Sequence, residues 1–373
     1  MTGAARPGSA PGRRWRRAGL VAGALVTALA LAEVALRCLD FPADLEQEWL
    51  LLPEPVRKRV FDAETLLANP EFEDDQHYRT APGKKTLVVL GDSFAVGHHV
   101  GAAEGFVDRL GEMLRAAGVE VTIINMGMGY AGNDQHLALL QHKVLARLRP
   151  DLVLWQLCYN DFWENVELSL YRLDDAGGLV PHGIDWNWLY VRERIGRCLP
   201  GPLAILKRTY LCRLVLNATK RLRMAQVPVA YRDDPLEYGR RKGARIVEEM
   251  VRLARKNGFP LLAVQVAPQA VHLLREATPP DALPEWCGRC FAAQKAMIAD
   301  REHYIDAEFT PEDLALVNAQ FGTRISSIGH GLFLDGERDQ AALGTRHYNR
   351  YGHWLFARKI GQYLCAHRVP LLD

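Results

Sequence analysis

The stretch that decides the fold is TLVVLGDSF, residues 86–94. Its first five residues are β-branched or leucine, a composition typical of a strand that is buried on both faces. The run ends in Gly91-Asp92-Ser93, a triplet typical of the turn that follows such a strand. The stretch therefore predicts a strand of a parallel sheet with a serine just beyond its carboxyl end.

Strand and helix patterns alternate after this strand. Helices are predicted at 104–117, 135–148, 235–258 and 285–300, and strands at 119–125, 150–161, 259–268 and 303–308. This alternation implies right-handed βαβ crossovers and a parallel sheet covered on both faces. We predict an α/β fold, a flavodoxin-like three-layer α/β/α arrangement with a five-stranded parallel sheet of order 2-1-3-4-5. Residues 163–234 interrupt the rhythm and are predicted to be a helical insertion over the edge of the sheet.

The N-terminus has the pattern of a membrane or export segment. Arg13, Arg14, Arg16 and Arg17 precede fifteen uncharged, mostly apolar residues, 18–32. We predict a basic cytoplasmic N-terminus (1–17), a transmembrane anchor or signal segment (18–37), a stalk (38–83) and a folded domain (84–373). The basic residues favour a single-pass, N-in orientation with the domain outside the cytoplasm. Cleavage after Ala30 or Ala32 would instead give a secreted or periplasmic protein.

Composition excludes some functions. The chain has 373 residues, 49% of them hydrophobic and 24% charged, as globular proteins do. Its net charge of +2 is not concentrated on one basic face, so we expect no nucleic-acid partner. Six of the seven cysteines follow residue 38 and would permit three disulfides in an oxidising compartment. No motif calls for a metal or a cofactor.

Polar or glycine-rich motifs follow three successive predicted strands. They are Gly91-Asp92-Ser93, residues 125–129 (NMGMG) and residues 159–161 (YND). Ligands of open parallel sheets bind at the carboxyl ends of strands, beside the point where strand order reverses. The sequence therefore predicts a site at this edge of the sheet.

The three motifs, together with HYNRYGH at 347–353, resemble the sequence blocks of the SGNH (GDSL-like) hydrolase family. The resemblance runs from about Thr86 to Ala366. It implies a serine nucleophile at Ser93, a general base at His347, and esterase, acylhydrolase or deacetylase chemistry, with some relatives being O-acetyltransferases. The membrane-anchored, envelope-facing members of the family also resemble this chain at the N-terminus.

The chemistry of these residues agrees with the resemblance. A serine hydroxyl is a poor nucleophile without a base in hydrogen-bond reach, and His347 can be that base. The tetrahedral intermediate needs preorganised donors, for which we predict the Ser93 and Gly129 backbone N–H groups and the Asn160 side chain. The family's glycine position falls on Tyr130, so Gly127 and Gly132 remain alternatives to Gly129.

The acid that usually orients the histidine is missing. In the family it lies two or three residues before the histidine, where this chain has Thr345 and Gly344. Asp339 is the nearest upstream carboxylate and is our candidate for the third catalytic residue. A Ser–His dyad oriented by a backbone carbonyl and an inactive protein are the other two possibilities.

We therefore predict a membrane-anchored serine esterase or acylhydrolase that acts on an acylated carbohydrate or lipid through an acyl-enzyme on Ser93. The alternatives are an O-acyltransferase acting on envelope glycans and a catalytically inactive glycan-binding protein.

Overall fold

The computed structural model describes residues 11–39, 41, 81, 83–97, 100–101, 103–129, 131–167, 170–182, 201–224, 227–276, 285–299, 304–334, 347–367 and 369. The chain divides into two compact units. One contains residues 1–52 and 191–222, and the other contains residues 53–190 and 223–373.

The larger unit is built on a five-stranded parallel sheet in the order β2-β1-β3-β6-β7. Its strands are β1 (Lys85–Gly91), β2 (Val121–Gly127), β3 (Leu152–Leu157), β6 (Leu261–Gln265) and β7 (Tyr304–Ile305). In sequence order this is 2-1-3-4-5, so the predicted flavodoxin-like topology is confirmed. Because β1 lies between β2 and β3, the chain reverses direction across the sheet at β1, and the loops after these three strands meet there.

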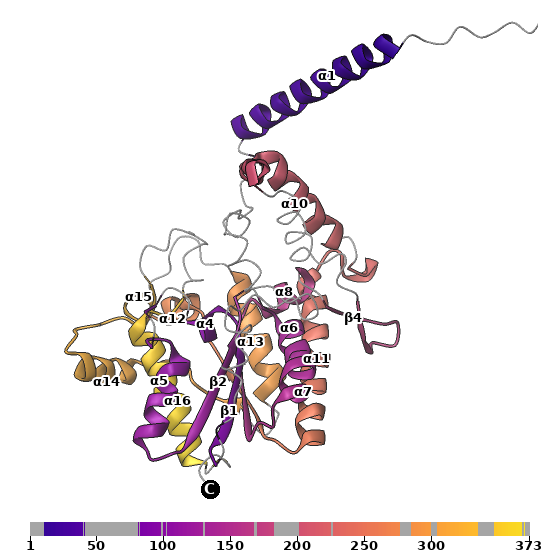
Figure 1. Cartoon of the computed structure of the whole chain (residues 1–373). Coiled ribbons are helices and arrows are strands. Elements are labelled where there is room, and N and C mark those ends of the chain that lie inside the picture. The colour runs from indigo at the N-terminus through magenta and orange to yellow at the C-terminus, as the bar shows by residue number, and fades with distance from the viewer. Residues whose placement is uncertain are drawn as a thin grey trace, which may run out of the picture. The chain divides into compact units, whose positions relative to one another are not determined.

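Helices cover both faces of this sheet (Figure 1). One face is covered by α5 (Phe106–Ala116) and α16 (Arg350–Ala366). The other face is covered by α6 (Asn133–Leu139), α7 (Leu145–Arg147) and α11 (Pro235–Asn257). Within β1, Leu87 and Val89 belong to one apolar core, and Val88 and Leu90 belong to the other. Alternate side chains of a strand point to opposite faces, so a strand buried on both faces is apolar throughout, as the sequence indicated.

The remaining helices of the larger unit are short or lie at the edges of these layers. They are α4 (Ser93–Val96), α8 (Asp161–Glu167), the 3₁₀ turn η4 (Val229–Tyr231), α12 (Gln269–Arg275), α13 (Glu285–Ala299), α14 (Pro311–Phe321) and α15 (Ile328–Gly331).

Several boundaries differ from the predictions. The second strand ends at Gly127, two residues later than expected, because its parallel pairing with β1 continues to the Gly91–Gly127 pair. The helix predicted at 135–148 contains a π-helical segment, η2 (Leu140–Val144), between α6 and α7. The closing helix begins at Arg350, where the Asn349 side chain accepts hydrogen bonds from the Tyr351 and Gly352 backbone N–H groups.

The insertion at 163–234 is not wholly helical. It contains a β-hairpin, β4 (Tyr171–Leu173) paired with β5 (Leu179–Pro181), which the sequence analysis missed. Its turn, DDAGG at 174–178, is built from Asp and Gly residues, which is the signal that could have revealed it. The Asp174 carboxylate accepts hydrogen bonds from the Ala176 and Gly178 N–H groups across this turn.

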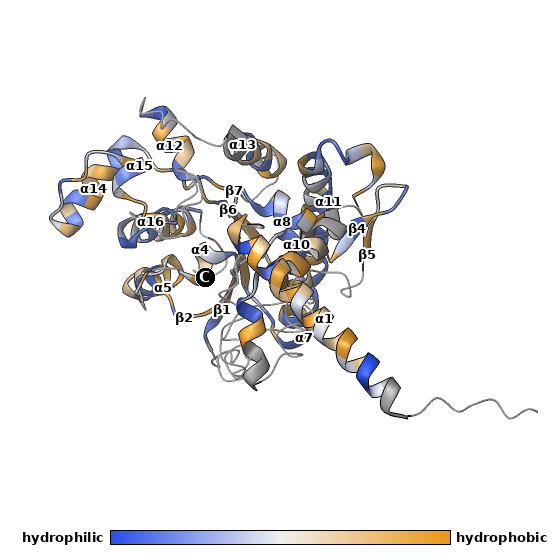
Figure 2. Cartoon of the chain, turned by 90° about the horizontal axis from the view of Figure 1, so that it is seen from above, coloured by the Kyte–Doolittle hydropathy of each residue, from blue (hydrophilic) through white to orange (hydrophobic). Residues whose placement is uncertain are grey.

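The smaller unit contains α1 (Pro11–Cys38), the 3₁₀ helix η3 (Gly201–Arg208) and all but the last two residues of α10 (Tyr210–Met224). Residues 15–38 of α1 are long and apolar enough to span a membrane, although a signal sequence passes the same test. Figure 2 shows this helix as largely hydrophobic beyond its basic first turns.

Four of the six cysteines considered for disulfides, Cys158, Cys212, Cys290 and Cys365, are free thiols. Three disulfides among the six therefore do not form.

Candidate active site

Ser93 is the first residue of α4, directly beyond the central strand β1. The cap of this one-turn helix is Asp92, whose carboxylate accepts a hydrogen bond of 2.9 Å from the Phe94 backbone N–H. The Ser93 hydroxyl is therefore not used as a helix cap. A Cβ atom on Gly91 would lie 2.8 Å from the Ala95 Cβ atom and would also clash with the Gln156 side chain, so only glycine fits at this turn.

His347 lies within hydrogen-bond reach of Ser93. Its Nε2 atom is 2.8 Å from the Ser93 Oγ atom. The imidazole ring packs against Phe94, with the ring centroids 4.8 Å apart. The His347 carbonyl also accepts a hydrogen bond of 3.0 Å from the Leu334 N–H, which fixes the backbone that carries the imidazole. The structure thus brings together the two residues that the sequence predicts as nucleophile and base.

Two other polar residues of the HYNRYGH stretch, Asn349 and His353, hold it in place. The Asn349 side-chain amide donates to the Gly331 and Phe333 carbonyls while its oxygen caps α16. His353 is fully buried, and its Nδ1 atom accepts a hydrogen bond from the Phe106 N–H at the start of α5. Burial lowers the pKa of His353 to about 3, so its ring is neutral. His353 joins two helices and His347 faces Ser93.

Three glycines, Gly127, Gly129 and Gly132, lie at or just after the end of β2, and their backbone N–H groups differ in their hydrogen bonds. The Gly127 N–H donates to the Asn125 side chain at 2.9 Å, and the Gly132 N–H donates to the Gln135 side chain at 3.0 Å. Within the part of the chain that the structure describes, the Gly129 N–H donates to no group. Gly129 therefore keeps the free donor that an oxyanion hole needs, which favours it over the two alternatives.

Gly127 has a packing role instead. A Cβ atom at this position would lie 2.6 Å from the Ala95 Cβ atom and 2.7 Å from the Val96 backbone nitrogen. The neighbouring Asn125 side chain donates a hydrogen bond of 2.8 Å to the Ala95 carbonyl. These contacts press α4 against the end of β2 and thereby fix the turn that carries Ser93.

The Ser93 N–H likewise donates no hydrogen bond among the described residues, whereas the N–H groups of Phe94, Ala95 and Val96 all donate to Asp92. Such an unpaired donor at a helix start is available to an anion.

Asn160 follows the third strand, at the start of α8. Its side-chain amide donates a hydrogen bond of 2.9 Å to the Glu164 carboxylate, one turn further along the helix. A side-chain amide has two N–H bonds, so this contact fixes the group and leaves one donor for a ligand. The three predicted oxyanion donors thus follow three adjacent strands, β1, β2 and β3.

Asp161 holds the turn beside Asn160 and is completely buried. Its Oδ2 atom accepts hydrogen bonds from the Cys158 N–H, the Asn133 side chain and the Gln294 side chain, at 2.8–3.1 Å. Burial, and after it the charge of Asp92, raises the pKa of Asp161 well above its usual value. Asp161 therefore has a structural role at this turn.

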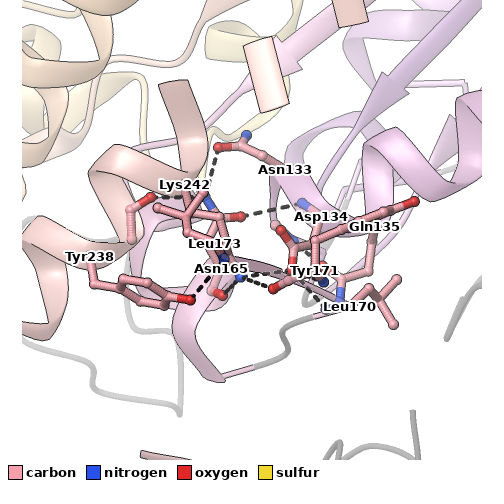
Figure 3. A network of polar contacts seen from close by, with 11 residues as sticks. Asn133, Asp134, Gln135, Asn165, Leu170, Tyr171, Leu173, Tyr238 and Lys242 are labelled. Carbon is pink, nitrogen blue, oxygen red and sulfur yellow. Dashed lines mark hydrogen bonds and ion pairs between the residues drawn. The ribbon is translucent and has the colours of Figure 1, made fainter. Parts of the chain in front are cut away.

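The Asn133 side chain, which donates to Asp161, also belongs to a buried polar network (Figure 3). The Asn133 side chain also accepts a hydrogen bond from Asn165, whose backbone carbonyl accepts one from the Lys242 ammonium. Lys242 forms an ion pair of 2.8 Å with Asp134, and both side chains are fully buried. Asp134 in turn accepts from the Leu170 and Tyr171 N–H groups at the start of the hairpin. The network ties α6, α8, α11 and β4 to the Asn160 turn.

Two residues that support the site, Gln156 and Glu164, were not predicted from the sequence. The Gln156 side chain accepts a hydrogen bond of 3.0 Å from the Asp92 N–H, and Glu164 fixes Asn160. The signal for Gln156 was present, since it is the one polar residue in the otherwise apolar strand LVLWQL. Burial raises the pKa of Asp92, whereas the Phe94 N–H and then the charge of His347 oppose this increase.

Asp339, the predicted third catalytic residue, lies outside the described residues. The fold and the Ser93–His347 pair, placed at the carboxyl edge of a parallel sheet, are the arrangement that serine hydrolases use.

The comparisons with known proteins agree with this class. A model of the GDSL-like lipase/acylhydrolase family matches residues 89–287, more than half of the chain. The chain therefore belongs to the GDSL-like lipase/acylhydrolase family. The matched region contains Ser93, Gly129 and Asn160 and ends before His347.

Several crystal structures resemble this chain at low sequence identity. The lipase Lip_vut3 from a goat rumen metagenome is 14% identical, with a TM-score of 0.38 over 74% of this chain and 96% of that chain. A putative acylhydrolase from Bacteroides fragilis NCTC 9343 is 14% identical, with a TM-score of 0.38 over 80% and 97%. Axe2, an acetylxylan esterase from Geobacillus stearothermophilus, is 12% identical, with a TM-score of 0.40 over 74% and 93%. No curated protein matches the chain.

Proposed function

We propose that this protein is a serine esterase that removes acyl or acetyl groups from a carbohydrate or lipid ester through an acyl-enzyme on Ser93. The observation that carries the proposal is the 2.8 Å contact between the Ser93 hydroxyl and the His347 Nε2 atom. Membership of the GDSL-like lipase/acylhydrolase family supports the same class of reaction.

In the proposed reaction, the Ser93 Oγ atom attacks the ester carbonyl carbon while His347 Nε2 takes the hydroxyl proton. The oxygen of the tetrahedral intermediate becomes negative and accepts hydrogen bonds from the Ser93 N–H, the Gly129 N–H and the Asn160 amide. His347 then gives the proton to the leaving alcohol as the carbon–oxygen bond breaks. A water molecule attacks the acyl-enzyme in the same way and releases the acid.

The orientation of His347 is the second part of the proposal. Asp339 is the candidate for a triad, and a dyad without it is the alternative. The Asp339→Asn variant separates them, because losing a triad acid typically lowers kcat by about 10⁴-fold, whereas a dyad keeps its activity.

The test is labelling of the full-length protein with a fluorophosphonate, combined with hydrolysis of p-nitrophenyl esters of increasing acyl length. We expect wild type to be labelled and active, and Ser93→Ala to be neither. Ser326, an exposed serine, supplies the matched control, because Ser326→Ala should behave as wild type. Equal activity of wild type and Ser93→Ala would refute the nucleophile. An unlabelled, inactive wild type would instead favour the glycan-binding alternative, and acyl transfer to an added sugar in place of hydrolysis would favour the O-acyltransferase.

We also propose that α1 anchors the protein in a membrane, N-in, with the hydrolase domain outside the cytoplasm. The apolar length of residues 15–38 and the arginines before it support this topology. Protease added to intact spheroplasts should digest the domain, and N-terminal sequencing should find Met1 or Thr2. A new N-terminus just after Ala30 or Ala32 would support the cleaved, secreted form instead.

A further inference from the structure

The end of α1 and the start of α10 are joined by a carboxylate. The two oxygens of Glu33 accept hydrogen bonds of 3.0 Å from the Tyr210 and Leu211 backbone N–H groups. These are the first two residues of α10, where backbone donors have no partner inside the helix and negative charge is favourable. Glu33 therefore fixes where α10 begins relative to the last turns of α1.

Two guanidinium groups complete this joint. Arg37 donates a hydrogen bond of 2.7 Å to Glu33 and lies over the Tyr210 ring, 5.5 Å from its centroid. Arg213 lies over the same ring at 4.6 Å. Both contacts are cation–π interactions, which add to the hydrogen bonds of the joint.

The segment that starts at this joint is strongly basic. Residues 201–224, which form η3 and α10, contain six basic residues and no Asp or Glu. The basic residues are Lys207, Arg208, Arg213, Lys220, Arg221 and Arg223. The segment alone has a charge of +6, whereas the whole chain has +2, so the charge is local to this segment.

The same segment exposes apolar side chains. Ile205 is 71% exposed, Leu206 is 44% exposed and Val215 is 53% exposed. Basic and apolar side chains combined on one short helical segment are typical of helices that lie in the interface of a membrane. Anionic headgroups attract such basic residues while the apolar side chains enter the boundary of the acyl chains.

The hydrogen bonds between Glu33 and α10 also indicate at which depth α10 meets the bilayer. Glu33 lies in the last turns of the helix of residues 15–38 that is long enough to cross a membrane. Because the first residues of α10 are hydrogen-bonded to Glu33, α10 begins near the end of the membrane span.

We propose that η3 and α10 form an interfacial segment that lies in the headgroup layer of the bilayer crossed by α1 and binds anionic phospholipids there. The inference rests on α1 being a membrane anchor and is independent of the chemistry at Ser93. The occupant of the exposed apolar side chains of this basic segment is thus a lipid surface.

The experiment places the photoreactive residue benzoylphenylalanine at position 215 of the full-length chain, in nanodiscs with equal amounts of phosphatidylcholine and phosphatidylglycerol. Mass spectrometry then counts the adducts with each lipid. We expect lipid adducts at position 215, with phosphatidylglycerol favoured by at least about twofold. Position 26, in the middle of α1, should also form lipid adducts and so reports insertion of the anchor.

Charge variants test the role of the basic residues. In the triple variant Arg208→Glu/Lys220→Glu/Arg221→Glu, the ratio of phosphatidylglycerol to phosphatidylcholine adducts should fall to about one, because the attraction to anionic lipid is lost. The matched control Arg208→Lys/Lys220→Arg/Arg221→Lys keeps the charge and should keep the preference. The proposal is overturned if position 215 forms no lipid adducts, if position 26 forms none, or if the reversed variant keeps its preference. Protein adducts as the main product at position 215 in native membranes would show a protein partner instead.

Discussion

The Ser93 Oγ atom and the His347 Nε2 atom lie 2.8 Å apart although the two residues are 254 positions apart in the sequence. Asp92 caps α4 in place of Ser93, and Asn349 caps α16 just after His347. Neither side chain of the pair is therefore needed to start its helix. The two side chains can therefore hydrogen-bond to each other, as the proposed reaction requires.

Asn160 supplies one oxyanion donor in the proposed reaction. Replacing it with alanine removes the donor, and loss of one such group typically lowers kcat by about 10²–10³-fold. We expect that loss for Asn160→Ala in p-nitrophenyl ester hydrolysis, with little change in KM, because the interaction strengthens only in the transition state. A normal kcat for this variant would exclude Asn160 from the oxyanion hole.

Glu164 positions Asn160 through a hydrogen bond of 2.9 Å. Glu164→Ala should lower kcat because the Asn160 amide is no longer held. Glu164→Gln keeps an acceptor oxygen and should restore most of the activity. If alanine and glutamine reduce kcat equally, the charge of Glu164 matters and its hydrogen bond does not.

Gly129 offers a test of its backbone donor. A Cβ atom there meets no heavy atom within 4 Å, so Gly129→Ala should fold and keep its activity. Gly129→Pro removes the N–H and should lower kcat by about 10²–10³-fold. Thermal unfolding of both variants checks that the fold is retained. Equal kcat values for alanine and proline would exclude the Gly129 N–H as a donor.

The Lys242–Asp134 pair predicts a large effect on stability. Both side chains are fully buried, so Lys242→Met leaves the Asp134 charge without its ion-pair partner. Breaking a buried pair typically costs about 3–5 kcal/mol in the free energy of unfolding. Lys256→Met, on the exposed face of the same helix, should change that free energy by less than about 0.5 kcal/mol. Urea denaturation measures both, and equal effects would mean that the buried pair contributes little.

His353 predicts a dependence of stability on pH. Its pKa is about 3 in the folded protein, below the ordinary histidine value of 6.5. Below pH 6.5 the unfolded chain binds a proton that the folded protein does not, so the free energy of unfolding falls as pH decreases from about 6.5 towards 3.

Replacing His353 with glutamine removes this titration. The slope of stability against pH should become shallower by up to about 1.4 kcal/mol per pH unit within that window. Chemical denaturation of wild type and His353→Gln at several pH values between 4 and 7 measures the difference. Parallel curves for the two proteins would show that His353 does not titrate on unfolding.

Much of the fold was predictable because the sheet is buried on both faces. A strand such as LVVL is then apolar throughout, and turn residues such as Gly91-Asp92 mark where it ends. Boundaries were less predictable, since the pairing of Gly127 with Gly91 and the π-helical segment at 140–144 depend on neighbouring elements. The hairpin after α8 was missed because each of its strands has only three residues.

The sequence by itself determined the strand order, the family and the identity of Ser93, Asn160 and His347 as candidates, because short motifs at strand ends are local patterns. Only the tertiary structure decided which of the three glycines has a free N–H, that Gln156 and Glu164 support the site, and that the His347 imidazole reaches Ser93. These are contacts between residues far apart in the chain, and such contacts exist only after the sheet has brought its strand ends together.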